Sequence, residues 1–238
     1  MSDLGRQTNN PPADLRERLA AVRERIERAA RRAGRDPAAV ELVAVTKTHP
    51  ADAVRAAIDA GQSLFGENRV QEALPKMDAV GPGPRWHLIG HLQRNKAAAA
   101  VGRFELIHSV DSTRLIEELE RRAAAADTQQ AILLQLNVAG EASKFGAAPA
   151  DLPALLAALA AAPHLRALGL MTIPPWDDDP ERTRPHFSAL RRLLEEAQGP
   201  PNFEKKHLSM GMSGDFEVAI EEGATLVRLG SALFGSRL

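Results

Sequence analysis

The 238-residue chain contains neither cysteine nor tyrosine, and lysine and arginine (30) almost balance aspartate and glutamate (31). The lack of cysteine excludes disulfide bonds, thiolate catalysis and cysteine-ligated zinc. The formal net charge of -1 gives no broad basic field that would attract nucleic acid or an anionic membrane. No apolar run reaches the length of a spanning helix, and the polar start MSDLGRQTNNPP lacks a signal-peptide apolar region. We therefore expect a cytoplasmic protein that binds neither nucleic acid nor membrane.

Short apolar segments alternate with helical patterns along almost the whole chain. Residues 1–12 have the composition of a disordered leader, and a helix is predicted from Asp14, with Glu17 at capping-box spacing and Gly34 as its stop. Strands are then predicted at 41–47, 63–66, 86–90, 105–110, 131–138, 167–173, 206–210 and 225–230. Helices are predicted between them, at 52–60, 69–77, 93–101, 113–126, 151–162, 182–197 and 216–222.

Strands that alternate with helices pair in parallel through crossover connections. Eight of them predict one domain over residues 13–238, a closed (β/α)₈ TIM barrel with an extra N-terminal helix. The alternative is an open doubly wound sheet, but no GxGxxG fingerprint follows the first strand.

The segment ELVAVTKTH, residues 41–49, places a single lysine at the end of an apolar strand. Leu42 to Val45 leave no polar face, so the strand is expected to be buried on both sides, as in a parallel sheet. Loss of hydration at the strand end favours the neutral amine of Lys47, which is the form that condenses with an aldehyde. The alternative is a structural lysine that pairs with a carboxylate.

Other polar residues stand at the ends of the predicted strands, where a barrel of this kind carries its site. They are Glu67, Asn68, His91, Ser109, Asp111, Asn137 and Ser209, with Arg228 inside TLVRLG. Each taken singly is more typical of a cap, a turn or a core polar group than of a catalytic residue. Their common position at the strand ends therefore predicts a site at this end of the barrel.

Two turns rich in small residues follow the last two strands. Ser213 and Gly214 precede a helix, and Gly230 and Ser231 begin another short segment. Exposed backbone N–H groups at such turns bind anions, and barrels often bind phosphate after strands seven and eight, although plain glycine turns remain the alternative. A lysine facing a phosphate site fits pyridoxal 5'-phosphate (PLP), which carries an aldehyde and a phosphate on opposite sides of one ring.

Seven ordered motifs extend through the chain beyond the leader: LVAVTK, FGENRVQE, WHLIGHLQRNK, IHSVDS, LLQLNVAGEASKFG, GLMTIPP and HLSMGMSGDFEVAIEEGATLVRLGSALFG. With them the sequence resembles the pyridoxal phosphate homeostasis proteins, whose fold is similar to the N-terminal barrel of alanine racemase. The chain departs from the family pattern at Arg69, where tyrosine is frequent, and at Ser231, where threonine is usual. The change at Arg69 bears on how the second loop closes over the ring.

The resemblance implies the following cofactor-binding residues. Lys47 would form the internal aldimine, and Arg228 would lie near the pyridine nitrogen. Phosphate contacts would come from Ser213, Gly214, Gly230 and Ser231, and the ring would be lined by Asn68, Met171 and Ser209.

The expected function is reversible binding of PLP in its intracellular homeostasis and delivery, without efficient amino-acid turnover. A permanently charged guanidinium disfavours protonation of the pyridine nitrogen, and the unprotonated ring is a poorer electron sink. A two-base racemase also needs a tyrosine from a second domain, and this chain has neither. Further expected partners are other B6 vitamers and PLP-dependent apoenzymes, and the protein is expected to be a monomer. The alternatives are a racemase-like enzyme, a Schiff-base aldolase that uses Lys47 on a phosphorylated sugar, and an interaction scaffold.

Two further groups of residues are expected to have structural roles. His87 and His91 are four apart, but Gly90 and the strand context deny them a common helix face, so a metal site is not predicted. Asp215 and Glu217 would oppose a nearby phosphate, and we expect both to point away from it.

Overall fold

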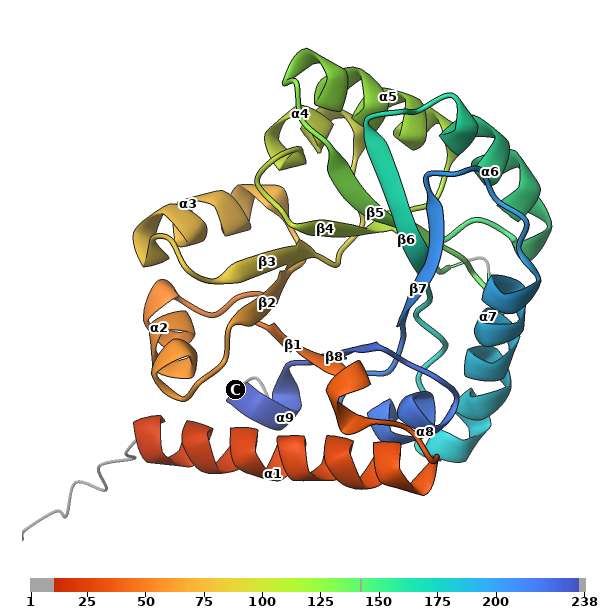
Figure 1. The fold of residues 1–238 in the computed structure, drawn as a ribbon. Coiled ribbons are helices and arrows are strands. Elements are labelled where there is room, and N and C mark those ends of the chain that lie inside the picture. The colour runs from red at the N-terminus through yellow and green to blue at the C-terminus, as the bar shows by residue number, and fades with distance from the viewer. Residues whose placement is uncertain (1–10, 142, 236–238) are drawn as a thin grey trace, which may run out of the picture.

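The structure is a computed structural model that describes residues 11–141 and 143–235. Eight parallel strands form a closed barrel in sequence order, and β1 pairs with β8 to close it, with Leu42 beside Val227 (Figure 1). The TIM-barrel prediction is thus confirmed. The strands are β1 (Glu41–Val45), β2 (Leu64–Glu67), β3 (Arg85–Leu88), β4 (Leu106–Val110), β5 (Gln130–Gln135), β6 (Leu165–Met171), β7 (Phe203–Ser209) and β8 (Leu226–Leu229).

Helices surround the barrel, as Figure 1 shows. They are α1 (Pro11–Arg32), α2 (Ala51–Asp59), α3 (Val70–Val80), α4 (Ala97–Ala100), α5 (Thr113–Ala125), α6 (Leu152–Ala160), α7 (Arg184–Glu196), α8 (Phe216–Glu221) and α9 (Ser231–Phe234). Short 3₁₀ turns are η1 (Pro37–Ala39), η2 (Arg94–Lys96), η3 (Pro149–Asp151) and η4 (Pro180–Thr183). No helix in the described part of the chain is long and apolar enough to cross a membrane.

The N-terminal helix α1 begins at Pro11, three residues before the predicted start. Proline is tolerated in the first turn of a helix because its missing N–H would have no partner there. Asp14 therefore lies in the first turn and binds Arg18 instead of capping the helix, so the predicted capping box is wrong. Residues 1–10 of the predicted leader lie outside the described residues. Gly34, at φ +66°, ends the helix as predicted.

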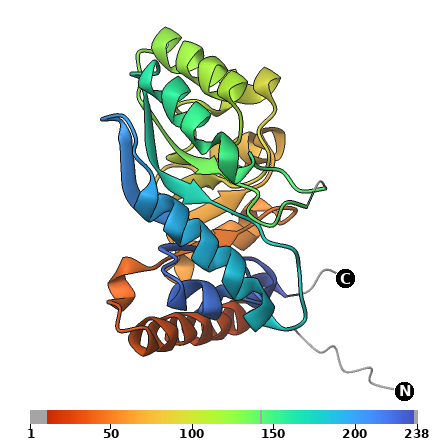
Figure 2. The ribbon, with the colours of Figure 1, turned by 90° about the vertical axis from the view of Figure 1, so that its right-hand side faces the viewer.

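The helix α1 packs across the outside of the barrel against α8 and α9 (Figure 2). Its apolar stripe is buried, with Leu19, Val22 and Ile26 at 6% exposure or less. Full burial of an aliphatic side chain stabilises a fold by about 1.5–3 kcal/mol. This extra helix is thus a covering layer for the last two βα units, which carry the predicted phosphate turns.

Several predicted boundaries differ from the structure where turns replace regular elements. The predicted helix at 93–101 is the 3₁₀ turn η2 followed by the single turn α4, and the strand predicted at 131–138 ends at Gln135. Strand β7 begins at Phe203, three residues before the predicted start. The short segment predicted at Ser63–Gly66 is a strand, β2, although shifted by one residue to Leu64–Glu67.

The barrel interior is built by the alternation of side chains along each strand. Its apolar cluster comprises Val43, Val45, Leu64, Ile89, Leu106, Leu133, Met171 and Leu226. The outward-facing side chains pack instead in the larger cluster beneath the helices. Strand β1 ends at Val45, two residues before the predicted end. Because side chains two apart share a face, Lys47, just beyond the strand, continues the inward direction of Val43 and Val45.

Candidate functional site

A cavity of about 360 Å³ lies beyond the carboxyl ends of the strands, where the sequence predicts the site. Its volume is in the range of natural small-molecule sites. Its lining comes from several βα loops: Val45, Lys47, His49, Asn68, Ile89, Ile173, Trp176, Met212, Ser213, Gly214, Arg228, Gly230, Ser231 and Gly235.

Lys47 enters this cavity from the end of β1, and the backbone on both sides of it is held tightly. On the preceding side, the Thr46 carbonyl oxygen accepts a hydrogen bond from Lys76 Nζ at 2.7 Å. On the following side, Thr48 has φ +67°, a conformation that β-branched residues rarely adopt. Such strained backbone persists only where the surrounding structure enforces it. The direction of Lys47 is therefore set by its neighbours as well as by its strand.

The predicted phosphate turns lie together beside the end of β1, since β8 pairs with β1 and a Cβ atom at Gly230 would lie 3.4 Å from the Val45 carbonyl oxygen. The Ala232 N–H donates to Ser213 Oγ at 3.3 Å, which joins the turn after β7 to the start of α9. The backbone N–H groups of Ser213, Gly214, Gly230 and Ser231 donate to no acceptor within the described residues. Converging N–H groups without acceptors are a donor set for an anion such as a phosphate.

Arg228 lies in β8 at the bottom of the cavity and is only 4% exposed. Its Nη1 donates to Ser209 Oγ at 2.5 Å, and its Nη2 donates to the Thr172 carbonyl oxygen at 2.8 Å. Burial lowers the pKa of Arg228 to about 10, so the guanidinium still carries its charge at neutral pH. The site thus contains a fixed cation with donors only.

Asn68 lies at the end of β2 and carries an unused acceptor. Its Oδ1 atom is buried and has no hydrogen-bond partner within the described residues. Its backbone is approached closely by the neighbouring strand, because a Cβ atom at Gly90 would lie 2.3 Å from the Asn68 carbonyl oxygen. Only glycine fits at position 90 without displacement of Asn68. Asn68 lines the cavity, and a buried amide oxygen without a partner is a group that a bound molecule with a donor would satisfy.

Seven of the nine residues predicted to bind the cofactor line this single cavity, namely Lys47, Asn68, Ser213, Gly214, Arg228, Gly230 and Ser231. Met171 and Ser209 do not line it. Both are fully buried, Met171 in the apolar cluster of the barrel interior and Ser209 beneath Arg228. Their effect on a ligand would therefore be exerted through the residues above them.

The sequence reasoning missed several lining residues. His49 lies two residues after Lys47, and Met212 directly precedes Ser213. Both belong to motifs in which only the adjacent residues were predicted to bind a ligand. Ile173 and Trp176 come from the loop after β6, and Trp176 is 74% exposed. A loop without regular structure gives no periodic signal, so its residues could not be assigned to the cavity from sequence.

Several other polar residues near the cavity have structural partners. Glu217 binds Arg25 of α1 at 2.8 Å, as expected for a carboxylate directed away from the phosphate turns. Asp215 accepts the Met212 N–H at 2.6 Å and so shapes the turn itself. His91 stacks on Phe145, whereas His87 lies inside the barrel. No group of three or more potential metal ligands occurs among the described residues.

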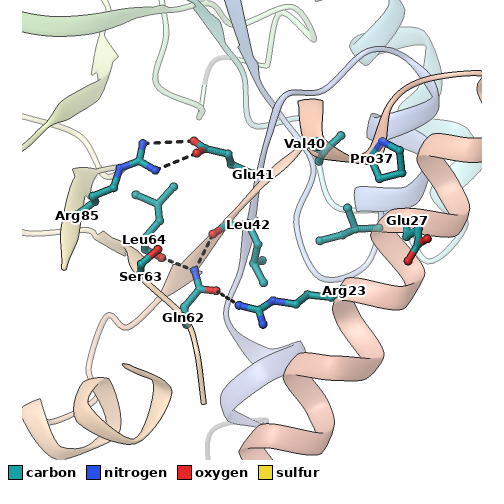
Figure 3. A pocket seen from close by; sticks show the side chains of 12 residues that line it. Arg23, Glu27, Pro37, Val40, Glu41, Leu42, Gln62, Ser63, Leu64 and Arg85 are labelled. Carbon is teal, nitrogen blue, oxygen red and sulfur yellow. Dashed lines mark hydrogen bonds and ion pairs between the residues drawn. The ribbon is translucent and has the colours of Figure 1, made fainter. Parts of the chain in front are cut away.

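A second cavity, of about 390 Å³, lies at the opposite end of the barrel between α1 and the first strands (Figure 3). Its charged side chains and Gln62 are already paired. Arg85 binds Glu41 at 2.9 Å, and Gln62 donates to two backbone carbonyl oxygens, those of Leu42 and Leu64 (Figure 3). The paired groups at this end contribute to stability, whereas the cavity at the carboxyl ends has backbone donors and a side-chain acceptor without partners among the described residues.

Comparison with known proteins agrees with this geometry. The family model "Alanine racemase, N-terminal domain" matches residues 18–238. Two relatives carry the name "Pyridoxal phosphate homeostasis protein". The one from Pseudomonas aeruginosa is 48% identical over 94% of this chain and 96% of its own length, and the one from Aquifex aeolicus is 46% identical over 93% and 97%. The solved structure of PipY from Synechococcus elongatus, with PLP bound, superposes with a TM-score of 0.81 at 40% identity, over 93% of this chain and all of that one. The chain therefore belongs to the pyridoxal phosphate homeostasis protein family, built on the barrel of the alanine racemase N-terminal domain.

Proposed function

We propose that this protein binds PLP in the cavity at the carboxyl ends of the strands and holds it reversibly for intracellular PLP homeostasis. The observation that carries the proposal is that Lys47, the two phosphate turns and Arg228 all line one cavity of about 360 Å³. The relatives named as PLP homeostasis proteins and the PLP-bound structure of PipY support it.

The residues of the cavity match the chemical groups of PLP. When bound, PLP supplies an aldehyde that an amine can condense with. Lys47 would supply that amine. The N–H groups of Ser213, Gly214, Gly230 and Ser231 would bind the phosphate, and Arg228 would face the pyridine nitrogen. Asn68 Oδ1, which lacks a partner within the described residues, would accept a hydrogen bond from the ligand.

We also propose that the protein does not turn over amino acids efficiently. Arg228 keeps its charge and is fixed by two hydrogen bonds, which disfavours a proton on the facing ring nitrogen. An unprotonated ring is a poorer electron sink for a carbanion. The chain also has no tyrosine for the second acid or base of a racemase. The proposal extends to a cytoplasmic monomer that binds other B6 vitamers and supplies PLP-dependent apoenzymes.

The test is an absorption spectrum of the purified protein with and without PLP, followed by borohydride reduction and peptide mass spectrometry. We expect a visible band that borohydride removes, with the added mass on Lys47. The Lys47→Ala variant should lose the band. A variant at Lys96, which is also half-buried but does not line the cavity, is the matched control and should keep it.

Three outcomes would contradict the proposal. A colourless protein that instead captures the carbonyl of a phosphorylated sugar would favour an aldolase. Unchanged ligand binding in Lys47→Ala would favour a scaffold. Racemisation of L-alanine or another amino acid at about 1 per second or faster, an ordinary enzyme rate, would refute the absence of efficient turnover.

A further inference from the structure

Four buried polar side chains form a continuous line across the barrel interior, beginning at Arg228. Arg228 Nη1 lies 2.5 Å from Ser209 Oγ, which lies 2.8 Å from His108 Nδ1. His108 Nε2 in turn lies 2.9 Å from His87 Nδ1. The four side chains come from β8, β7, β4 and β3, and none is more than 4% exposed. The line therefore starts at the cavity floor and runs through the barrel toward the opposite end.

The direction of these hydrogen bonds follows from the chemistry of arginine, which can only donate. Ser209 Oγ accepts from Arg228, so the single hydroxyl proton of Ser209 goes to His108 Nδ1. His108 then carries its own proton on Nε2 and donates it to His87 Nδ1. In the reverse arrangement the Ser209 proton would have no acceptor on this line, which is unfavourable for a fully buried hydroxyl.

The far end of the line supports the same direction. With Nδ1 as an acceptor, His87 carries its proton on Nε2, which faces Glu105 Oε1 at 3.8 Å. At this distance the attraction is electrostatic, since the His87 Nε2 atom makes no direct hydrogen bond within the described residues. Glu105 is held by Arg85 at 2.7 Å, at the end of the barrel that Figure 3 shows. The reverse direction would place a nitrogen lone pair against this carboxylate.

Both imidazoles are neutral in this arrangement. Burial lowers the pKa of His108 well below its ordinary value, and the nearby His87, Arg228 and His207 lower it further. Burial also lowers the pKa of His87, against the opposing effect of Glu105. Both hydrogen-bond partners of Arg228 among the described residues are uncharged oxygens. The Asp215 carboxylate also attracts the guanidinium, but without a direct hydrogen bond to it among the described residues. The orientation of the Ser209 hydroxyl therefore contributes directly to how well that buried charge is stabilised.

We propose that His108 and His87 are positioning residues for Arg228, which fix the Ser209 hydroxyl as an acceptor and so hold the guanidinium in place against the ring nitrogen of the ligand. This inference rests on the proposed function for the identity of the ligand. The tautomers of the two histidines do not depend on it. Neither histidine lines the cavity, so both act through Ser209 and Arg228.

The first test uses the protein without added cofactor. We expect ¹⁵N chemical shifts of the two histidine rings, recorded by NMR at neutral pH, to show the neutral Nε2–H tautomer for both residues. A proton on Nδ1 of His108, or a charged ring, would overturn the proposal whether or not the protein binds PLP.

The second test compares His108→Leu, which removes the acceptor, with His108→Asn, whose side-chain oxygen replaces Nδ1 but does not reach His87. We expect the pH-dependent transition of the visible band of the PLP-loaded protein to shift by about one unit or more in His108→Leu. In His108→Asn most of the wild-type profile should return.

A wild-type profile in a folded His108→Leu variant would overturn the proposal. If that variant fails to fold, Ser209→Ala, which removes the hydroxyl from the line, should produce the same shift, and its absence would be equally decisive. A wild-type protein without any visible band would instead refute the proposed function and leave the tautomer test standing.

Discussion

The ion pair between Lys76 and Glu67 lies directly behind the strand end that carries Lys47, and its disruption gives a quantitative prediction. Lys76 Nζ lies 2.5 Å from Glu67 Oε1, and the two side chains are 9% and 0% exposed. The Thr46 hydroxyl donates to the same Oε1 atom at 2.7 Å, and the Thr46 carbonyl oxygen accepts from Lys76. These bonds fix the residue that precedes Lys47.

Replacement of Lys76 by methionine leaves the Glu67 carboxylate buried without its cation. Removal of one partner of a buried ion pair destabilises proteins by about 3–5 kcal/mol, because the remaining charge is uncompensated. We expect Lys76→Met to lower the free energy of unfolding by this amount. Replacement of both side chains by apolar ones removes the uncompensated charge, so Lys76→Met/Glu67→Leu should recover most of the loss. A deficit of about 1 kcal/mol should remain from the lost Thr46 hydrogen bond.

The assay is urea unfolding of the single variant, the double variant and a matched surface control. Arg103 binds Asp78 in an exposed pair whose side chains are 43% and 68% exposed, and Arg103→Met should cost less than about 1 kcal/mol. We also expect slower borohydride-fixed labelling of Lys47 in Lys76→Met, since the backbone before it is released. A Lys76→Met variant as stable as Arg103→Met, or a double variant no more stable than the single one, would refute the reasoning.

Three further predictions concern the cavity and the barrel interior. Gly90→Ala should destabilise the protein by about 1–3 kcal/mol, because the new methyl group overlaps the Asn68 carbonyl oxygen, whereas Gly214→Ala, which meets no atom within 4 Å, should leave stability unchanged in thermal unfolding. Ser213→Ala, which removes the hydroxyl that accepts the Ala232 N–H and joins the two turns, should weaken the binding of inorganic phosphate in calorimetry by a factor that corresponds to about 0.5–1.5 kcal/mol, and unchanged affinity would contradict a role of this hydroxyl in holding the turns for phosphate. Burial lowers the pKa of His207 from 6.5 to about 4. The unfolded chain therefore binds a proton on His207 at a higher pH than the folded protein does, and the free energy of unfolding should fall as pH decreases across that range. His207→Gln should lose that part of the pH dependence, and an identical slope in the variant would contradict it.

The barrel could be predicted from the sequence because each strand and each helix has its own pattern within a short segment. Each strand is a short apolar segment and each crossover has its own helical pattern, so the element order follows without knowledge of long-range contacts. The inward direction of Lys47 is also local, since it continues the alternation of Val43 and Val45. The same alternation, applied to β2, predicts that Glu67 points away from the site. Gly66 faces the interior, where its Cβ would meet Val43 and Ile89, and Glu67 therefore points outward to Lys76.

The features that could not be predicted depend on contacts between distant segments. His87 and His108 can be placed inside the barrel by alternation, but their 2.9 Å contact depends on the stagger between β3 and β4, which no single segment encodes. The same holds for Ser209, which was expected to line the ring and instead lies beneath Arg228. Trp176 reaches the cavity from an irregular loop, and its position depends on how that loop packs.

The interior of a barrel of this type is usually filled by layers of bulky branched side chains. Here Arg228, Ser209, His108 and His87 form a line of four polar side chains that are joined by hydrogen bonds. Such a network is more demanding than apolar packing, since any missing partner leaves a buried group unsatisfied. The arrangement is understandable if the guanidinium has to be held rigidly in a poorly hydrated place, where its interaction with a ligand is strong. The fixed groups of the cavity are mainly donors: this guanidinium and the N–H groups of the two turns. A donor set that is already fixed by the protein favours tight retention of an anionic, ring-nitrogen-bearing ligand over the movement of protons that turnover requires.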